Sequence, residues 1–249
     1  MSLPVSALPP GSGLHRVLLM LVAFSVVVGC QETSRIVADT ETGSILAIGD
    51  SVMEWNAEDE ASIPDVIAAE LGRVVVNGGV SGARLSMPDD EAELGALGYD
   101  IREQYRARGW TWVVMDGGAN DLGDECGCGS CEATLNEMVS ADGQTGQYPD
   151  FVRSVVGDSS RVLVMGYYAP PAGAETEFTA CLDELDALNA RLTQMAAAIE
   201  GVHYASAAEV IDPADAASYD PDQVHPSVKG SRLIGERLAQ AILDAEREP

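Results

Sequence analysis

The chain has 249 residues, of which 46% are hydrophobic, so it can build the core of one domain, and disorder is excluded for most of its length. It contains 40 acidic residues against 14 lysines and arginines, which gives a formal net charge of −26. A surface this acidic repels phosphate backbones, and nucleic-acid binding is therefore not an expected function.

The first 29 residues carry the pattern of a targeting signal. An apolar run at residues 17–28 is too short to span a bilayer, because a membrane helix needs about 20 residues. The run leads into Val-Val-Gly-Cys, a tetrapeptide that resembles the lipobox of bacterial lipoproteins. The resemblance implies that residues 1–29 are removed as a signal peptide and that Cys30 is acylated, with several acyl chains giving a stable anchor. An ordinary secretory signal and an uncleaved anchor remain alternatives, because little positive charge precedes the run.

Residues 30–43 are polar and predict a tether between the lipid and a folded domain at residues 44–249. In that domain, short apolar runs alternate with amphipathic helical patterns. The apolar runs predict buried strands at residues 44–49, 73–77, 110–115, 161–167 and 202–205. The helical patterns predict helices at or near residues 63–71, 97–108, 133–139, 148–156, 181–199 and 227–245. Apart from its short helix, the stretch 123–146 is expected to be irregular.

The alternation of strands and helices predicts the fold class. It is typical of parallel strands with helices packed on both faces. We therefore expect an α/β protein, a three-layer α/β/α sandwich around a mostly parallel five-stranded sheet. The carboxyl ends of such strands lie at one edge, where open α/β sheets place their sites.

Four short polar blocks lie at that edge in the predicted fold. Ser51 belongs to Gly-Asp-Ser-Val after the first strand, and Gly82 closes Asn-Gly-Gly-Val-Ser-Gly after the second. Asn120 belongs to Gly-Ala-Asn-Asp after the third strand, and Asp222 and His225 lie in Asp-Gln-Val-His-Pro before the last helix. Any one block is also ordinary turn chemistry. The four blocks in this order resemble the SGNH hydrolases, also called the GDSL esterase/lipase family, from residue 44 to the last helix.

The chemistry of these residues points to the same family. A serine hydroxyl is a weak nucleophile and needs a base within hydrogen-bonding distance. His225 is the expected base, because it lies three residues from Asp222, whose carboxylate can hold the imidazole in the required tautomer. His203 lies in the middle of a predicted strand, where we expect a structural role.

The resemblance also implies the flavodoxin-like SGNH hydrolase fold and an oxyanion hole. Attack on an acyl group makes its carbonyl oxygen negative, so hydrogen-bond donors must already be in place. By resemblance, these donors are the backbone N–H groups of Ser51 and Gly82 and the side-chain amide of Asn120. Glycine suits a close approach of backbone to substrate, since it has no Cβ. Asp50 is expected to be structural and not catalytic.

Four cysteines remain once Cys30 is set aside. They are Cys126, Cys128, Cys131 and Cys181. An even number in an exported chain favours two disulfides, although four thiolates binding zinc are an alternative. Because cysteines two residues apart bridge poorly, we prefer to pair Cys128 with Cys181 and the other two with each other. The cluster follows Asn120 and is expected to form one wall of the site.

The sequence thus predicts a serine esterase that hydrolyses carboxylic esters through an acyl-enzyme, with no cofactor and no metal. We expect it in the cell envelope, anchored to a membrane by lipid and facing the periplasm or the exterior. Its substrate is a small-molecule, lipid or glycan ester: the resemblance allows a lipase-like or lysophospholipase-like enzyme or a carbohydrate O-acetyl esterase. A binding lipoprotein that keeps the fold without turnover is the alternative. The oligomeric state is not predicted.

Overall fold

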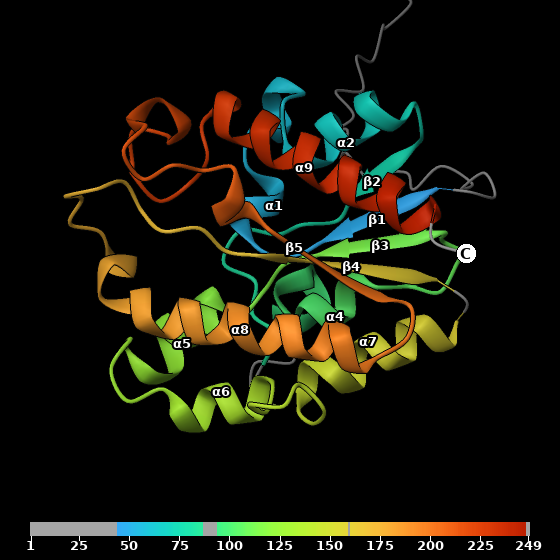
Figure 1. Ribbon diagram of the computed structural model, residues 1–249, viewed down its shortest axis with the longest axis horizontal. Helices are drawn as coiled ribbons and strands as arrows, with labels where there is room; N and C mark the ends of the chain where they lie inside the picture. The colour runs from blue at the N-terminus through green and yellow to red at the C-terminus, as the bar shows by residue number, and fades with distance from the viewer. Residues whose placement is uncertain (1–43, 87–93, 159, 248–249) are drawn as a thin grey trace, which may run out of the picture. The chain divides into compact units, whose positions relative to one another are not determined.

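The computed structural model describes residues 44–86, 94–158 and 160–247 (Figure 1). The predicted signal peptide, the acylated Cys30 and the predicted tether lie outside the described residues. Within the described part of the chain, every helix is too short or too polar to cross a membrane.

Five strands of the described chain form one parallel sheet in the order β2-β1-β3-β4-β5. They are β1 (Ile45–Ile48), β2 (Val75–Asn77), β3 (Trp112–Met115), β4 (Arg161–Gly166) and β5 (Val202–Ser206). Ile45 of β1 lies opposite Val75 on one side and Trp112 on the other. This flavodoxin-like order has its switch point between β1 and β3, where ligands bind in such folds.

Helices cover both faces of the sheet and make the predicted three layers (Figure 1). On one face lie α2 (Ile63–Leu71) and α9 (Val228–Arg247), and on the other lie α7 (Gln147–Gly157) and α8 (Leu182–Ala198). The shorter helices are α1 (Ser51–Glu54), α4 (Ile101–Gln104), α5 (Ala119–Cys126) and α6 (Glu132–Met138). Single turns are η1 (Ala57–Asp59), η3 (Gly95–Tyr99), η4 (Glu177–Cys181), η5 (Ala207–Glu209) and η6 (Ala216–Ser218).

The core lies between these layers. Every residue of β1 and of β3 is buried, because both strands are central and have helices above and below. For this reason their sequences are continuous apolar runs and do not alternate between apolar and polar residues. On one face α9 packs against α2, β4 and β5, which fixes the start of α9 and the loop that precedes it.

Strand β2 was predicted to be buried, and that prediction was wrong. Its three residues are half-buried, and the preceding Val74 is 56% exposed. The reason is its position: β2 is an edge strand, so one of its sides has no neighbouring strand. An apolar run does not distinguish a central strand from an edge strand.

Two helix predictions also need correction. The helix expected near residues 97–108 is replaced by the turn η3 and the four-residue α4, because Gly98 has a φ of 93° and Asp100 is extended and caps α4. The stretch 123–146, expected to be largely irregular, contains the end of α5, which was not predicted. Gly118 (φ 108°) precedes α5 and Gly127 (φ 58°) ends it, so glycines that predicted a loop mark the two helix boundaries.

Candidate active site

The turn that connects β1 to α1, residues 49–52, is called the nucleophile turn below. It places Ser51 at the first position of α1, directly after β1 ends. The side chain of Gln104 forms two hydrogen bonds with Gly49. Its Oε1 accepts from the Gly49 N–H at 2.7 Å, and its Nε2 donates to the Gly49 carbonyl at 2.9 Å. Gly49 has a φ of 148°, and a Cβ there would overlap Asp116 Oδ1. Glycine is therefore required at this position.

Two buried carboxyl groups lie beneath the nucleophile turn. Asp50 accepts hydrogen bonds from the Val52 N–H at 2.9 Å and from the Tyr167 hydroxyl at 2.5 Å. Its own N–H donates to Asp116 Oδ1 at 2.9 Å. Burial raises the pKa of both carboxyl groups, and the nearby Asp50 raises the pKa of Asp116 further. Asp50 therefore holds the turn together, in the structural role expected for it.

Ser51, His225 and Asp222 form a continuous chain of hydrogen bonds. The Nε2 of His225 lies 2.8 Å from Ser51 Oγ, and its Nδ1 lies 2.6 Å from Asp222 Oδ2. The other oxygen of Asp222 accepts from the N–H groups of Val224 (2.9 Å) and His225 (3.0 Å). Burial raises the pKa of Asp222, but these hydrogen bonds outweigh it and hold the pKa below its usual value. An ionised carboxylate only accepts, so the proton lies on Nδ1 and leaves Nε2 to accept from Ser51.

Asn120 lies on the first turn of α5, at the end of β3. Its Nδ2 donates one hydrogen to the Ala83 carbonyl at 2.9 Å, and an amide nitrogen carries a second hydrogen. The neighbouring Asp121 accepts from the N–H groups of Leu85 (3.0 Å) and Ser86 (2.7 Å). Burial raises the pKa of Asp121 to about 6, against the opposing effect of these hydrogen bonds. The two residues thus fasten the loop after Gly82 to α5.

Gly82 lies one residue before the carbonyl that Asn120 holds. Its φ is 78°, and a Cβ there would have only Tyr99 within contact range, at 3.7 Å. Glycine is therefore favoured at position 82 by its positive φ, because no described atom would clash with a Cβ there. Glu54 of α1 fixes this turn, because its Oε2 accepts from the Ser81 N–H at 3.0 Å and from the Ser81 hydroxyl at 2.6 Å.

Comparison with known proteins identifies the family of this chain. The GDSL-like lipase/acylhydrolase family matches residues 47–233, which include all the residues just described. The chain belongs to this family. No curated protein matches the chain.

Solved structures of GDSL-like and related hydrolases share the fold. A GDSL-like lipase from Bacteroides thetaiotaomicron is 18% identical, with 82% of this chain and 89% of that chain covered and a TM-score of 0.55. The psychrotrophic esterase EstA from Pseudoalteromonas sp., solved with monoethylphosphonate as inhibitor, is also 18% identical. The comparison covers 83% of this chain and 100% of EstA, with a TM-score of 0.54. At these identities the likeness is one of fold.

A small cavity opens beside Ser51 in this GDSL-like hydrolase. It has a volume of about 40 Å³ and a mostly apolar lining. The lining residues are Asp50, Ser51, Val52, Ala119, Asn120, Tyr167, Tyr168, Pro170, Phe178, Leu185 and Val224. A second, more polar cavity of about 200 Å³ shares Asn120 and Phe178 with the first and also contacts Glu177 and Asp124. Among the described residues, neither lining includes Gly82.

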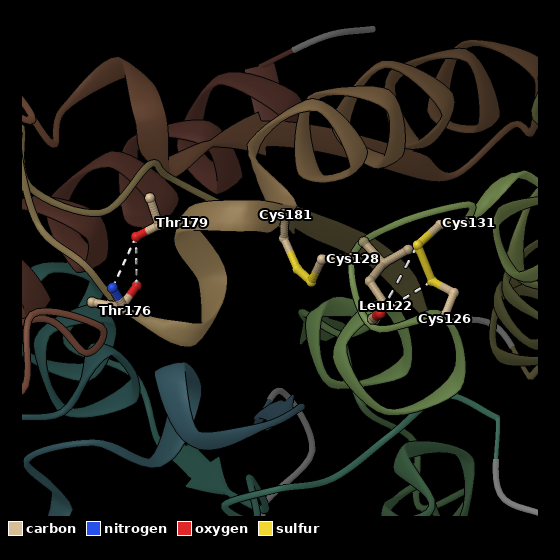
Figure 2. Close-up of a disulfide and its surroundings, with 7 residues drawn as sticks. All are labelled: Leu122, Cys126, Cys128, Cys131, Thr176, Thr179 and Cys181. Carbon is tan, nitrogen blue, oxygen red and sulfur yellow. Dashed lines mark hydrogen bonds between the residues drawn. A yellow bond between two sulfur atoms is a disulfide. The ribbon is translucent and has the colours of Figure 1, made fainter.

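The four cysteines have the pairing preferred from the sequence (Figure 2). Cys126 is bonded to Cys131, and Cys128 to Cys181, with Cα atoms 5.2 and 4.6 Å apart. No thiol of these four is left to bind zinc. The second bridge ties the loop after α5 to the start of α8, and Gly127 and Cys128 line the second cavity.

Several residues of the site were not predicted from the sequence. Trp55 stacks on the ring of His225, and Phe178 lines both cavities. A signal for Trp55 existed: it lies four residues after Ser51 and shares its face if a helix begins there. No comparable signal existed for Phe178. It lies three residues before Cys181, whose disulfide links this part of the chain to Cys128. His203 is half-buried on β5 and packs near Trp112, with ring centroids 5.3 Å apart, in agreement with a structural role.

Proposed function

We propose that this GDSL-like hydrolase is a serine esterase that cleaves carboxylic esters through an acyl-enzyme. The observation that carries the proposal is the chain of hydrogen bonds from Ser51 Oγ through His225 to Asp222, at 2.8 and 2.6 Å. The nucleophile, its base and the group that orients the base are thus within hydrogen-bonding distance of one another, as this mechanism requires.

In the proposed acylation step, Ser51 Oγ attacks the ester carbonyl carbon while its proton moves to His225 Nε2. Asp222 stabilises the imidazolium that forms, because its carboxylate accepts from Nδ1. The tetrahedral intermediate then collapses, and the imidazolium gives its proton to the departing alkoxide. Water, activated by the same imidazole, attacks the acyl-serine, releases the acid and restores Ser51.

The carbonyl oxygen becomes an oxyanion in both steps and needs donors. We assign this task to the N–H groups of Ser51 and Gly82 and to the second hydrogen on Asn120 Nδ2. One hydrogen bond supports this assignment: Asn120 Nδ2 donates one hydrogen to the carbonyl of Ala83, the residue after Gly82, and this bond orients the amide. Such preorganised donors usually make one of the largest contributions to catalysis.

The cavity beside Ser51 favours a short acyl group. With a volume of about 40 Å³ it is far smaller than the sites of about 300–1,000 Å³ that bind drug-sized ligands. Its apolar lining suits an alkyl chain of a few carbons. We therefore propose short-chain esters as substrates and leave the alcohol part, lipid or sugar, to experiment.

The test is a panel of nitrophenyl esters from acetate to palmitate, together with acetylated sugars. Ser51→Ala should reduce hydrolysis by a factor on the order of 10⁴ or more without changing thermal unfolding. Ser154→Ala, an exposed serine on α7, is the matched control and should retain full activity. Equal rates for Ser51→Ala and the wild type would remove Ser51 from the mechanism.

The same panel decides the alternative function, a binding lipoprotein without turnover. That alternative requires that the wild type hydrolyses no ester in the panel. Fastest turnover with acetate or butyrate would support the short-chain assignment. Fastest turnover with palmitate would contradict it.

Attachment to the cell envelope through Cys30 is a separate proposal, based on the apolar run and the Val-Val-Gly-Cys tetrapeptide. Cells grown with labelled palmitate should label the wild-type chain and not Cys30→Ser. Cys128→Ser is the control, since its cysteine is paired with Cys181 in the folded domain. Label that persists in Cys30→Ser would contradict the anchor.

A further inference from the structure

The indole of Trp55 lies flat against the imidazole of His225. The ring centroids are 3.7 Å apart, and the ring planes differ by 7°. Trp55 directly follows α1, and its backbone N–H donates to the Ser51 carbonyl at 2.8 Å. The residue that stacks on the base is thus also bonded to the backbone of the nucleophile, whose Oγ lies 2.8 Å from the same imidazole.

The next residue, Asn56, fixes the base from a second side. Its Nδ2 donates to the Pro226 carbonyl at 3.0 Å and to Ser231 Oγ at 2.9 Å. Asn56 has a φ of 65°, in the left-handed region, and precedes the turn η1. Since Pro226 follows His225, Trp55 contacts the ring of the histidine and Asn56 holds the backbone of the next residue.

Three groups surround the imidazole of His225. Asp222 is hydrogen-bonded to Nδ1, Ser51 is hydrogen-bonded to Nε2, and the indole of Trp55 stacks on one face. The carboxyl group of Asp50, in the turn before Ser51, also acts electrostatically on His225. Tyr168 holds the loop by donating to the Val224 carbonyl at 2.9 Å, and burial raises the pKa of Tyr168, so it is neutral. The His225 side chain is 17% exposed and is therefore partly shielded from water.

We propose that Trp55 is a positioning residue of the esterase site, which holds the His225 ring and stabilises its imidazolium form by a cation–π interaction. The inference rests on the proposed serine-esterase function. The face of an indole is electron-rich and attracts a cation more strongly than the face of phenylalanine. His225 becomes cationic when it takes the Ser51 proton, so the attraction is stronger in the transition state than in the resting enzyme, as catalysis requires.

Kinetic measurements on Trp55→Leu and Trp55→Phe test the proposal in the full chain. Leucine fills space without a π face, and we expect kcat to fall about 3- to 30-fold, the size of a partly desolvated cation–π interaction. Phenylalanine should restore most of the loss. KM should change less than about 2-fold, because Trp55 is not among the described residues that line the cavities.

The pH profile separates the proposed role from simple packing. If the indole stabilises the cation, its loss favours the neutral imidazole, and the acidic limb of kcat/KM should move to lower pH by about half a unit to one unit in Trp55→Leu. If the indole only shields the ring from water, its loss favours the cation, and the limb should move to higher pH. Tyr105→Leu is the control, since Tyr105 pairs edge-on with Phe151 outside the site and should leave the profile unchanged.

A titration of the imidazole by NMR makes the test independent of turnover. The His225 Cε1 proton, assigned with His225→Asn, should show a midpoint lower by about half a unit to one unit in Trp55→Leu than in the wild type. This result would support the role of Trp55 even if no ester in the panel were hydrolysed, in which case the proposed function alone would fail. An unchanged or higher midpoint would overturn the role of Trp55, as would an unchanged kcat in an active enzyme.

Discussion

The two sides of the active site are built by different means. On one side, the nucleophile turn is packed into the core, and its hydrogen bonds with Gln104, Tyr167 and Asp116 fix its conformation. On the other side, the cysteine segment, residues 126–131, follows Asn120 and lies largely at the surface, with two disulfides in place of a core. A turn surrounded by core needs no covalent support, whereas a Gly-rich surface segment would otherwise leave its neighbour Asn120 poorly positioned.

Removal of the Cys128–Cys181 bridge should have the largest effect on stability. Its cysteines are 53 residues apart, against 5 for Cys126–Cys131. Loop-closure entropy then predicts a loss of about 4 kcal/mol for Cys128→Ser/Cys181→Ser and about 2 kcal/mol for the other double variant. Urea unfolding measures both losses, and equal losses would contradict the comparison.

The same bridge links stability to activity. Reduction should lower ester hydrolysis before the helix signal in circular dichroism changes, because the bridge positions one wall and not the sheet. Mass spectrometry of the unreduced, digested protein should find no free thiol among these four cysteines, and metal analysis no stoichiometric zinc. Four free thiols or one bound zinc per chain would contradict the disulfide assignment.

Asn120→Ala tests the donor on the disulfide-supported side. Loss of one oxyanion donor should lower kcat by about 10²–10³, or about 3–4 kcal/mol. The free energy of unfolding should fall by only about 1 kcal/mol, because the variant also loses the hydrogen bond to Ala83. Gln194→Ala, on the exposed surface of α8, is the control and should stay close to wild type. A variant within a few-fold of wild type would remove Asn120 from the oxyanion hole.

Gly49→Ala tests the packed side. The new Cβ would overlap Asp116 in a backbone conformation that other residues avoid, and we expect a loss of about 3 kcal/mol in the free energy of unfolding. Gly72→Ala is matched to it, because Gly72 also has a positive φ, of 61°, but nothing lies within 4 Å of a Cβ there. That variant should lose about 1 kcal/mol. Similar losses would mean that backbone strain, and not the contact with Asp116, governs the turn.

Asp121, the residue after Asn120 on α5, should make the free energy of unfolding depend on pH. Folding raises its pKa from 3.8 to about 6, so the folded state binds this proton more tightly than the unfolded state. The resulting stabilisation is complete below about pH 3.8 and is lost as the pH rises through 6, a change of about 2–3 kcal/mol.

Asp121→Asn should remove this pH dependence. The asparagine side chain has one acceptor oxygen fewer than aspartate, so the variant loses some stability at every pH. The quantity to measure is therefore the difference between the free energies of unfolding at pH 4 and pH 7. This difference should be smaller in the variant than in the wild type. The exposed Asp183→Asn serves as control. A difference equal to that of the wild type would show that Asp121 is not the titrating group.

Much of this protein was predictable from sequence because the signals are local. Continuous apolar runs predicted the central strands, since a strand buried on both faces has no polar side. The four polar blocks predicted Ser51, Asn120, Asp222 and His225, and the structure brings Ser51, Asp222 and His225 into one chain of hydrogen bonds, with Asn120 lining the same cavity as Ser51. The spacing of the cysteines disfavoured one of the three possible pairings, and of the other two the structure has the one that we preferred.

The tertiary structure decided what depends on neighbours distant in sequence. The edge position of β2 follows from strand order, and the break near residue 98 follows from one glycine conformation, and neither is encoded in hydrophobic periodicity. The volume of the cavity beside Ser51 depends on Phe178 and Leu185, more than 100 residues away in the sequence. The stacking of Trp55 on His225 joins residues 170 positions apart, and such a contact exists only once α9 and α2 have packed and fixed the histidine loop beside α1.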